Sequence, residues 1–118
     1  MINSWEYKKE YKFLRTRILK SIDTVLKSGK LFFGDETEKF EKKFLKENKT
    51  KYGVSVSNGT NALLIALKAL NIGSGDEVIT VSNSAIATAS SIISSGAKIR
   101  FIDIDDDYLI DHKQIEKY

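Results

Sequence analysis

Apolar residues recur at helical spacing along the first half of the chain. Between Asn3 and Ser28 they lie three or four positions apart, with Lys, Arg and Glu between them, which predicts an amphipathic helix. Gly29 follows and suits the left-handed conformation that ends many helices. A second helix is predicted over 35–48, where acidic residues in the first turns complement the helix dipole. The first half therefore predicts two helices joined by a short apolar loop.

The pattern changes in the second half, where short β-type runs alternate with apolar helical runs. Strands are predicted over 52–57, 77–81 and 99–104, and helices over 60–71, 84–95 and 111–118. The first of these helices is apolar on almost every side, so we expect it to be buried on more than one face. The alternation predicts an α/β fold with a parallel sheet of βαβ units, preceded by the two helices. We expect the two parts of the chain to be 1–50 and 51–118.

Composition narrows the classes of function. The 118 residues include no Cys and a single His, so neither a disulfide framework nor a zinc site is expected. Residues 1–52 carry 14 basic against 8 acidic side chains, whereas 53–118 carry 5 against 8. A mildly basic half is typical of solvated helix faces, and nucleic-acid binding is not expected. No apolar run is long enough to cross a bilayer and no signal-peptide core is visible, so we expect a cytoplasmic protein with no membrane partner.

The residues Ser57-Asn58-Gly59-Thr60 lie between a predicted strand and an apolar helix. Free N–H groups at the start of a helix, together with the helix dipole, form an anion site that suits phosphate. Gly59 lets the backbone approach a ligand, and Thr60 can cap the helix or offer its hydroxyl. Such a site lies at the carboxyl end of a strand, where open α/β sheets bind ligands. Spacing alone favours a Thr-capped helix after a tight turn over a phosphate site.

Other polar residues give weaker signals. The acidic run at 103–107 lacks the Gly and the final Glu of a calcium-binding EF-hand loop. Asp103 and Asp105 could act as nucleophile and general acid of a phosphotransferase, but a solvated turn after a strand is the favoured interpretation. His112 is expected on the surface. Four aromatic residues are expected in the core: Phe32, Phe33, Phe40 and Phe44.

Four motifs follow one another along the chain. They are the loop SGKLFFGDETEKFE at 28–41, a predicted strand leading into NGTNAL at 58–63, the segment 67–79 that contains GSGDEVI, and the paired stretches 86–89 and 96–105. Together they resemble the N-terminal portion of the DegT/DnrJ/EryC1/StrS family of pyridoxal-phosphate (PLP)-dependent sugar aminotransferases. The resemblance covers nearly the whole chain. It implies the N-terminal part of the large domain of the aspartate-aminotransferase-like fold, known as fold type I.

The resemblance also implies an activity and a cofactor. Members of the family transfer an amino group, usually from glutamate, to the keto carbon of a nucleotide-linked sugar in amino-sugar and polysaccharide biosynthesis, and they are homodimers. The turn that holds the phosphate of PLP corresponds to Gly59 and Thr60, with Asn58 in place of the family's Ser. The loop at Phe33 and Gly34 would lie near the substrate. The resemblance thus favours the phosphate site over a simple capped turn.

Two departures from the family's pattern bear on these expectations. Where the family has an aromatic residue stacked on the cofactor ring, this chain has Ala85, and Ser84 precedes it in place of Thr; both are expected beside PLP. The family's cofactor-binding lysine and its ring-pairing aspartate lie downstream of the matched motifs, so no catalytic residue is assigned. We expect this chain alone to be inactive. The alternative is a small non-catalytic α/β domain that binds a phosphorylated ligand or a partner subunit.

Overall fold

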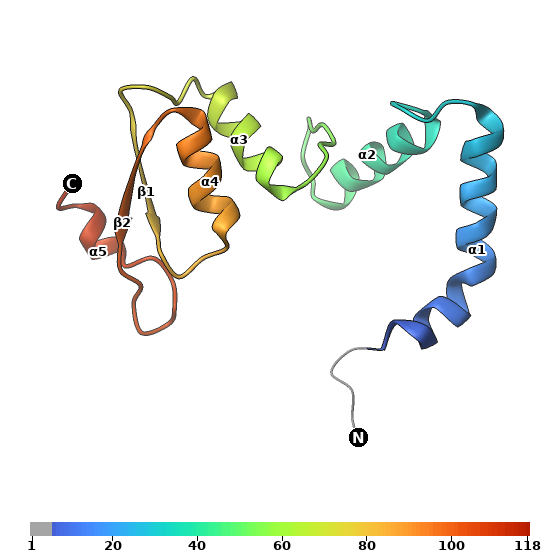
Figure 1. Cartoon of the computed structure of the whole chain (residues 1–118), viewed down its shortest axis with the longest axis horizontal. Coiled ribbons are helices and arrows are strands. Elements are labelled where there is room, and N and C mark those ends of the chain that lie inside the picture. The colour runs from blue at the N-terminus through green and yellow to red at the C-terminus, as the bar shows by residue number, and fades with distance from the viewer. Residues whose placement is uncertain (1–5) are drawn as a thin grey trace. The chain divides into compact units, whose positions relative to one another are not determined.

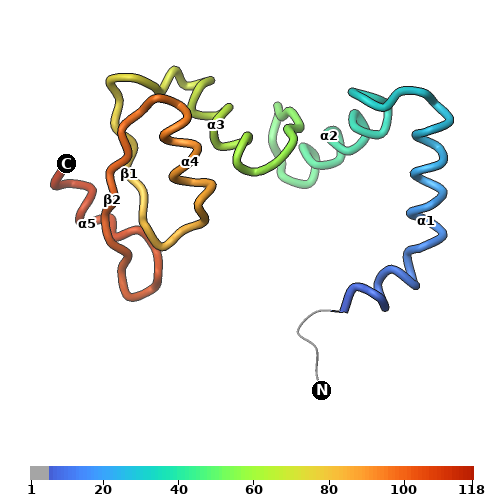
Figure 2. The backbone as a smooth tube through the Cα atoms, viewed as in Figure 1, coloured from blue at the N-terminus to red at the C-terminus, as the bar shows by residue number. Residues whose placement is uncertain are grey.

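The computed structural model describes residues 6–118, and the chain separates into two compact units, Met1–Ser55 and Val56–Tyr118 (Figure 1; Figure 2). The first unit holds helices α1 and α2, and the second holds both strands and the remaining helices. The beginning of the helix predicted from Asn3 lies outside the described residues. Helices thus precede the strand–helix alternation, in the predicted order.

The first unit is built from two amphipathic helices, α1 (Tyr7–Ser28) and α2 (Asp35–Glu47). Gly29 ends α1 with a φ of 69° and donates its N–H to the carbonyl of Leu26 at 3.2 Å, as the sequence predicted. Three acidic side chains lie in the first turn of α2, where the helix dipole favours them. Neither helix has a buried residue, so apolar side chains remain at the surface of both.

The phenylalanines that were expected in the core are exposed. Phe32 and Phe33 are 85% and 94% exposed, and Phe40 and Phe44 are also exposed. The last two contact each other across one turn of α2, with ring centroids 5.8 Å apart. The core prediction is wrong for these four residues, because a pair on one helix face covers only one side of each ring.

The segment predicted as a strand at 52–57 forms no strand. A strand needs a neighbour to complete its ladder of hydrogen bonds, and the two strands in the described residues pair only with each other. Instead, the hydroxyl and backbone N–H of Ser55 donate to the Glu41 carboxylate at 2.6 and 2.7 Å. These hydrogen bonds, the hydroxyl's foremost, hold the pKa of Glu41 below its ordinary value and join the segment to α2.

The second unit contains the predicted βαβ crossover. Strand β1 (Glu77–Val81) pairs in parallel with β2 (Lys98–Ile102), and α4 (Ile86–Ser95) connects them. The bounds of β1 are those predicted. Strand β2 ends earlier than predicted, because Ile104 leaves the ladder and forms an isolated bridge with Ile110. The α/β fold with parallel strands after helices is therefore confirmed.

The core of the second unit lies around α4. The hydroxyls of Ser91 and Ser95 each donate to a backbone carbonyl of the preceding turn at 2.7 Å, so these buried polar groups are satisfied. The small side chains of α4 allow its neighbours to approach closely. The residues classed as buried among those described are Ser91, Ile92, Ser95, Ala97 and Ile102.

Helix α3 (Gly59–Ala69) packs against α4 and has no buried residue. Leu63 and Ile65 are 44% and 47% exposed, although both are apolar. The expectation that this helix is buried on more than one face is therefore wrong for this chain. Helix α3 is apolar on most sides, which is typical of a helix packed between two neighbours. Among the described elements, α4 is its principal neighbour.

We predict that the Glu41–Ser55 contact makes the stability of the chain depend on pH in the acid range. The lowered pKa of Glu41 means that its contribution is present above the ordinary value of 4.5 and is lost as the pH falls through the folded-state pKa. Glu41→Gln should flatten this decline in urea unfolding followed by circular dichroism. Glu47→Gln, an exposed change on the same helix, should leave it intact. Equal acid dependence of all three proteins would contradict the assignment.

Candidate functional site

The start of α3 is capped by Asn58, and not by Thr60 as the capped-turn interpretation held. The Asn58 side-chain oxygen accepts the backbone N–H of Asn61 at 2.9 Å. The side-chain amide of Asn61 donates to the hydroxyl of Ser57 at 2.7 Å, which fixes the turn further. Sequence reasoning did not single out Asn61. The spacing could have indicated it, because the side chain of an N-cap residue accepts the backbone N–H of the residue three positions later, and Asn61 lies three positions after Asn58.

The cap leaves the first two backbone N–H groups of α3 available. In the described chain, neither Gly59 nor Thr60 donates its N–H to a protein atom. Apart from its two chain neighbours and the backbone of its own helix, no heavy atom lies within 4 Å of the place where a Cβ on Gly59 would sit, so a ligand can approach this backbone. We call the two N–H groups and the Thr60 hydroxyl the anion cradle. Paired donors at the positive end of a helix are suited to phosphate.

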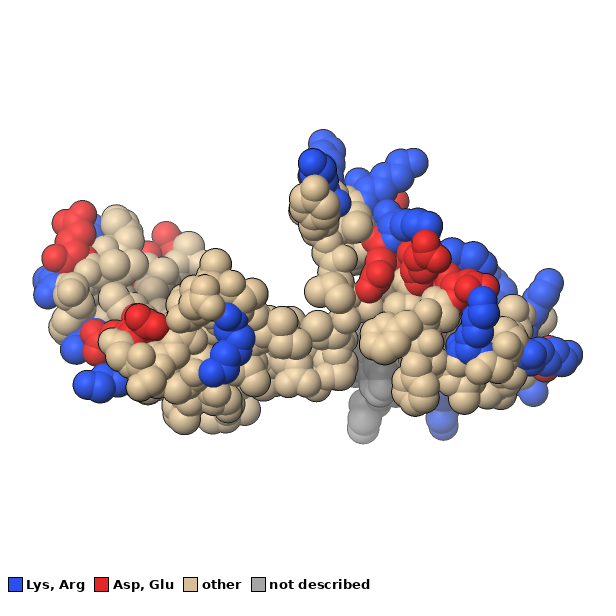
Figure 3. Space-filling model, turned by 90° about the horizontal axis from the view of Figure 1, so that it is seen from above, with Lys and Arg blue, Asp and Glu red and all other residues tan. Residues whose placement is uncertain are grey.

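The charge at the anion cradle is not neutralised from within its own helix. Helix α2 carries acidic side chains in its first turn, whereas α3 carries none. In the view of Figure 3, charged side chains crowd the part of the chain formed by α1 and α2, and the remainder shows mostly uncharged surface. A helix N-terminus without a carboxylate of its own keeps its attraction for an external anion.

Packing of α4 holds the first turn of α3 in place. Ser91 is 1% exposed, and its hydroxyl lies 2.7 Å from the carbonyl oxygen of Ala87 and 3.0 Å from that of Thr60, so its one proton is shared between the two. The two helices lie side by side, and both begin at the end of the unit where β1 ends (Figure 1). Open α/β sheets bind ligands at this carboxyl end of their strands. The anion cradle therefore lies where the fold favours a site.

Ser84 and Ala85 precede α4 at the same end of the unit. The hydroxyl of Ser84 is hydrogen-bonded to that of Thr88 at 3.0 Å, and Ala85 occupies the N-cap position of α4 without a side-chain cap. With Val81 and Phe101, among others, they line a pocket of about 140 Å³. Ligand sites for small molecules have roughly 300–1,000 Å³. The pocket is smaller than a typical small-molecule site, and the methyl of Ala85 offers no stacking surface.

Phe33 and Gly34 belong to the first unit, in the turn before α2. Phe33 has a φ of 48°, which is uncommon for a bulky residue. A Cβ on Gly34 would lie 2.6 Å from the carbonyl oxygen of Lys30, so the turn requires glycine there. The loop thus holds an exposed aromatic side chain on a tightly constrained backbone.

The acidic residues after β2 form a turn, as the favoured interpretation predicted. The Asp105 carboxylate accepts the backbone N–H groups of Asp107 and Leu109, both at 3.0 Å. His112 is exposed at the start of the one-turn helix α5 (His112–Ile115). Over 6–118, no three side chains that could ligate a metal gather in one place. None of the helices described there is long and apolar enough to cross a membrane.

A parallel βαβ crossover packed against a preceding helix defines an α/β protein. The family follows from the sequence match. Residues 13–118 match the model of the DegT/DnrJ/EryC1/StrS aminotransferase family, and the chain belongs to that family.

Known proteins support this assignment over most of the chain. The dTDP-3-amino-3,4,6-trideoxy-alpha-D-glucose transaminase of Micromonospora megalomicea subsp. nigra is 40% identical over 113 residues, which are 95% of this chain and 30% of that protein. An aminotransferase of the family from Brucella abortus has a crystal structure that matches with a TM-score of 0.90 at 28% identity, over 98% of this chain and 31% of that one. The chain thus spans about 30% of the length of its relatives and corresponds to their N-terminal portion.

The family uses PLP. The E. coli GDP-4-keto-6-deoxy-D-mannose-3-dehydratase was solved with bound hydrated PLP and matches with a TM-score of 0.75 at 28% identity, over 98% of this chain and 29% of that one. The anion cradle fits the phosphate of such a group, because Gly59 leaves open space beside two available donors. Ala85 does not fit the role of a stacking residue.

We predict that Asn58→Ala lowers the free energy of unfolding by about 1 kcal/mol, because the N–H of Asn61 loses its acceptor. Asn58→Ser, which retains a capping oxygen, should recover most of the loss. Thr60→Val should change stability by less than about 0.5 kcal/mol, because the Thr60 hydroxyl is not the cap. Urea unfolding followed by circular dichroism measures all three. A larger loss for Thr60→Val than for Asn58→Ala would reverse the cap assignment.

Proposed function

We propose that this chain is the N-terminal portion of a PLP-dependent aminotransferase that acts on a nucleotide-linked keto-sugar, and that the anion cradle holds the phosphate of PLP. The observation that carries the proposal is the pair of available N–H groups at Gly59 and Thr60, beside open space. Membership of an aminotransferase family and the transaminase activity named for a 40% identical relative support it.

Each residue of the turn has a distinct part in this proposal. The backbone N–H groups of Gly59 and Thr60 donate to phosphate oxygens, and the Thr60 hydroxyl adds a third donor. Asn58 positions these donors by capping the helix, in place of the family's Ser. Bound PLP supplies the electron sink on which amino-group transfer depends. These residues therefore bind and orient the cofactor, and none of them is assigned a catalytic step.

The remaining expected residues have proposed roles of their own. Ser84 and Ala85 lie beside the cofactor ring, and Phe33 and Gly34 lie near the sugar substrate. The amino donor is glutamate, the complete protein is a cytoplasmic homodimer, and the product serves amino-sugar or polysaccharide biosynthesis. The names of relatives that act on dTDP-linked and UDP-linked sugars support the substrate class.

We predict that Gly59→Ala weakens phosphate binding without destabilising the chain. Gly59 has no positive φ and no neighbour where the new methyl would lie, so the fold tolerates alanine. The methyl occupies the space through which the phosphate approaches. Charge-assisted hydrogen bonds contribute about 1.5–3 kcal/mol, so Kd should rise roughly tenfold or more.

The probe for calorimetry is pyridoxine 5′-phosphate, which lacks the aldehyde that would react with the lysines of the chain. Pyridoxine without the phosphate should show no difference between wild type and variant. Ser74→Ala, in the turn after the other end of α3, is the matched control and should bind like wild type. Unchanged affinity of Gly59→Ala for pyridoxine 5′-phosphate would place the phosphate elsewhere.

We predict that the pure 118-residue chain transfers no amino group from glutamate to a dTDP-linked keto-sugar, because it has no match to the lysine motif of the family. The assay measures 2-oxoglutarate in the presence of PLP, with the Micromonospora megalomicea transaminase as positive control. Formation of 2-oxoglutarate above the protein-free background would refute the prediction. Binding of pyridoxine 5′-phosphate without activity agrees with it.

A further inference from the structure

Asn58 and Gly59 form an exposed asparagine–glycine pair at the start of α3. Asparagine is among the thermolabile residues. It is converted to aspartate, or deamidated, when the backbone nitrogen of the next residue attacks its side-chain carbonyl carbon. Glycine hinders this attack least, because it has no side chain to oppose rotation of the peptide between the two residues. The pair is therefore a candidate for deamidation.

The attacking nitrogen of this pair is free of protein hydrogen bonds. In the described chain, Gly59 donates its backbone N–H to no protein atom. Every other asparagine of 6–118 is followed by a backbone N–H that donates to a backbone carbonyl. Asn83 is the nearest comparison, because it is also exposed and precedes a small residue, Ser84, whose N–H donates to the carbonyl of Ser82 at 2.9 Å. The donors after the other asparagines are the N–H groups of Lys49, Ala62, Ile72 and Ser84.

The cap of α3 also favours the reaction at the Asn58 side chain. Attack by nitrogen places negative charge on the side-chain oxygen, and that oxygen accepts the backbone N–H of Asn61 at 2.9 Å. It also lies at the positive end of the helix dipole. A fixed donor that points at an oxygen gaining charge stabilises the transition state. The hydrogen bond that caps the helix therefore activates the side-chain amide.

We propose that Asn58 is a site of spontaneous deamidation, and that the carboxylate formed there closes the anion cradle to phosphate. The Gly59 nitrogen loses its proton to hydroxide and bonds to the side-chain carbonyl carbon of Asn58. The bond from that carbon to the amide nitrogen breaks, and ammonia leaves with a proton from water. Water then opens the cyclic imide at either carbonyl, giving aspartate or isoaspartate. One water is consumed in all, and nothing is oxidised or reduced.

The effect on phosphate rests on the proposed function of the anion cradle, whereas the deamidation does not. Helix α3 has no acidic side chain in its first turn, so a carboxylate at its N-cap brings new negative charge beside the cradle. Aspartate caps a helix as well as asparagine does, so this product keeps the turn and repels an anion. Isoaspartate lengthens the backbone and disrupts the cap.

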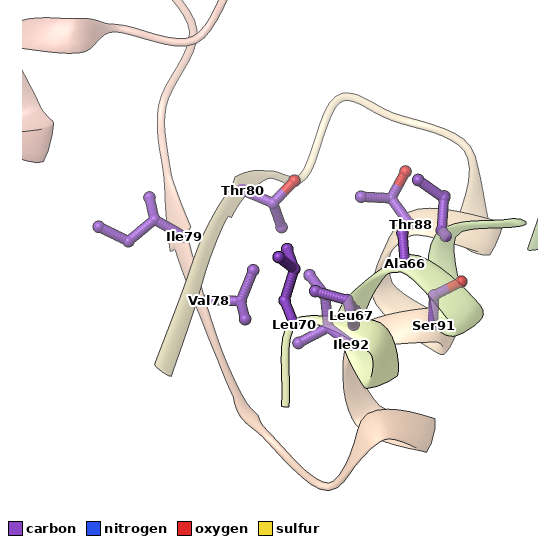
Figure 4. A pocket seen from close by; sticks show the side chains of 10 residues that line it. Ala66, Leu67, Leu70, Val78, Ile79, Thr80, Thr88, Ser91 and Ile92 are labelled. Atoms are coloured by element: carbon purple, nitrogen blue, oxygen red, sulfur yellow. The ribbon is translucent and has the colours of Figure 1, made fainter. Parts of the chain in front are cut away.

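Packing farther along α3 keeps the helix in place after the change. Ala66 and Leu67 of α3 line a pocket together with Ile92 of α4, and Figure 4 shows these side chains around the same space. None of the residues that line this pocket lies in the first turn of α3. The new charge therefore acts on the cradle without removing these apolar contacts.

Peptide mapping by mass spectrometry tests the deamidation. Wild-type chain is incubated in mildly alkaline buffer and digested with trypsin, which releases the peptide 52–68. We expect this peptide to gain the mass that marks replacement of an amide by a carboxyl group, with fragment ions that place the change at Asn58. Deamidation at Asn83 should be roughly tenfold slower, because its attacking nitrogen must first lose a hydrogen bond. Equal or faster deamidation at Asn83 would overturn the proposal.

Calorimetry with pyridoxine 5′-phosphate tests the closure of the cradle. Asn58→Asp stands in for the aspartate product and should raise Kd roughly tenfold or more, with no loss of stability in urea. Asn58→Ser keeps a capping oxygen but has no amide, so it should lose no affinity during an incubation that weakens binding by wild type. Saturating pyridoxine 5′-phosphate should slow deamidation at Asn58 and not at Asn83, because the phosphate engages the Gly59 N–H.

The two parts of the proposal fail separately. Unchanged affinity of Asn58→Asp would overturn the closure of the cradle, while the peptide mass still reports the deamidation. Loss of affinity by Asn58→Ser during incubation would assign the effect to another residue and overturn the closure as well. Absence of binding by fresh wild type would overturn the proposed function of the cradle, and the closure with it.

Discussion

The Ser91 hydroxyl shares its proton between the carbonyls of Ala87 and Thr60, and so connects the βαβ crossover to the helix that carries the anion cradle. Ser91 is buried, and its contact with Thr60 spans 31 positions of the sequence. The Asn58 cap orders the first turn of α3 locally, and this long-range contact joins that turn to α4. An anion site must hold its donors rigidly to gain from the helix dipole, so the geometry of the cradle depends on the packing of α3 against α4.

Features set by local chemistry could be predicted from the sequence. A glycine after the last apolar residue predicted the end of α1 at Gly29. Alternation of side chains predicted the bounds of β1, and capping residues predicted the turn at Asn58-Gly59-Thr60. The identity of the cap could not be predicted as readily, because Asn and Thr both serve as caps. The choice depends on which of them lies just outside the helix, which only the backbone conformation decides.

Features that need a distant partner were the ones mispredicted. The segment at 52–57 has the alternation of a strand, but alternation does not supply the neighbour that a strand requires. The same reason accounts for the exposure of α3 and of Phe40 and Phe44. These segments are rich in apolar residues, which predicts burial. Whether a side chain is buried also depends on the other elements that pack against it, and these cannot be found from the segment alone. For the candidate site, Ser84 and Ala85 lie just before α4, at the end of the unit where β1 ends, and Ala85 carries no aromatic ring.

The βαβ crossover also has a consequence for how the polypeptide folds during synthesis. Strand β1, helix α4 and strand β2 are consecutive, and the three occupy only the stretch 77–102. Contacts between elements so close in sequence carry a smaller loop-closure cost than contacts between distant ones. This substructure is therefore expected to form on the ribosome soon after it emerges, ahead of residues synthesised later, and to act as a template on which they assemble.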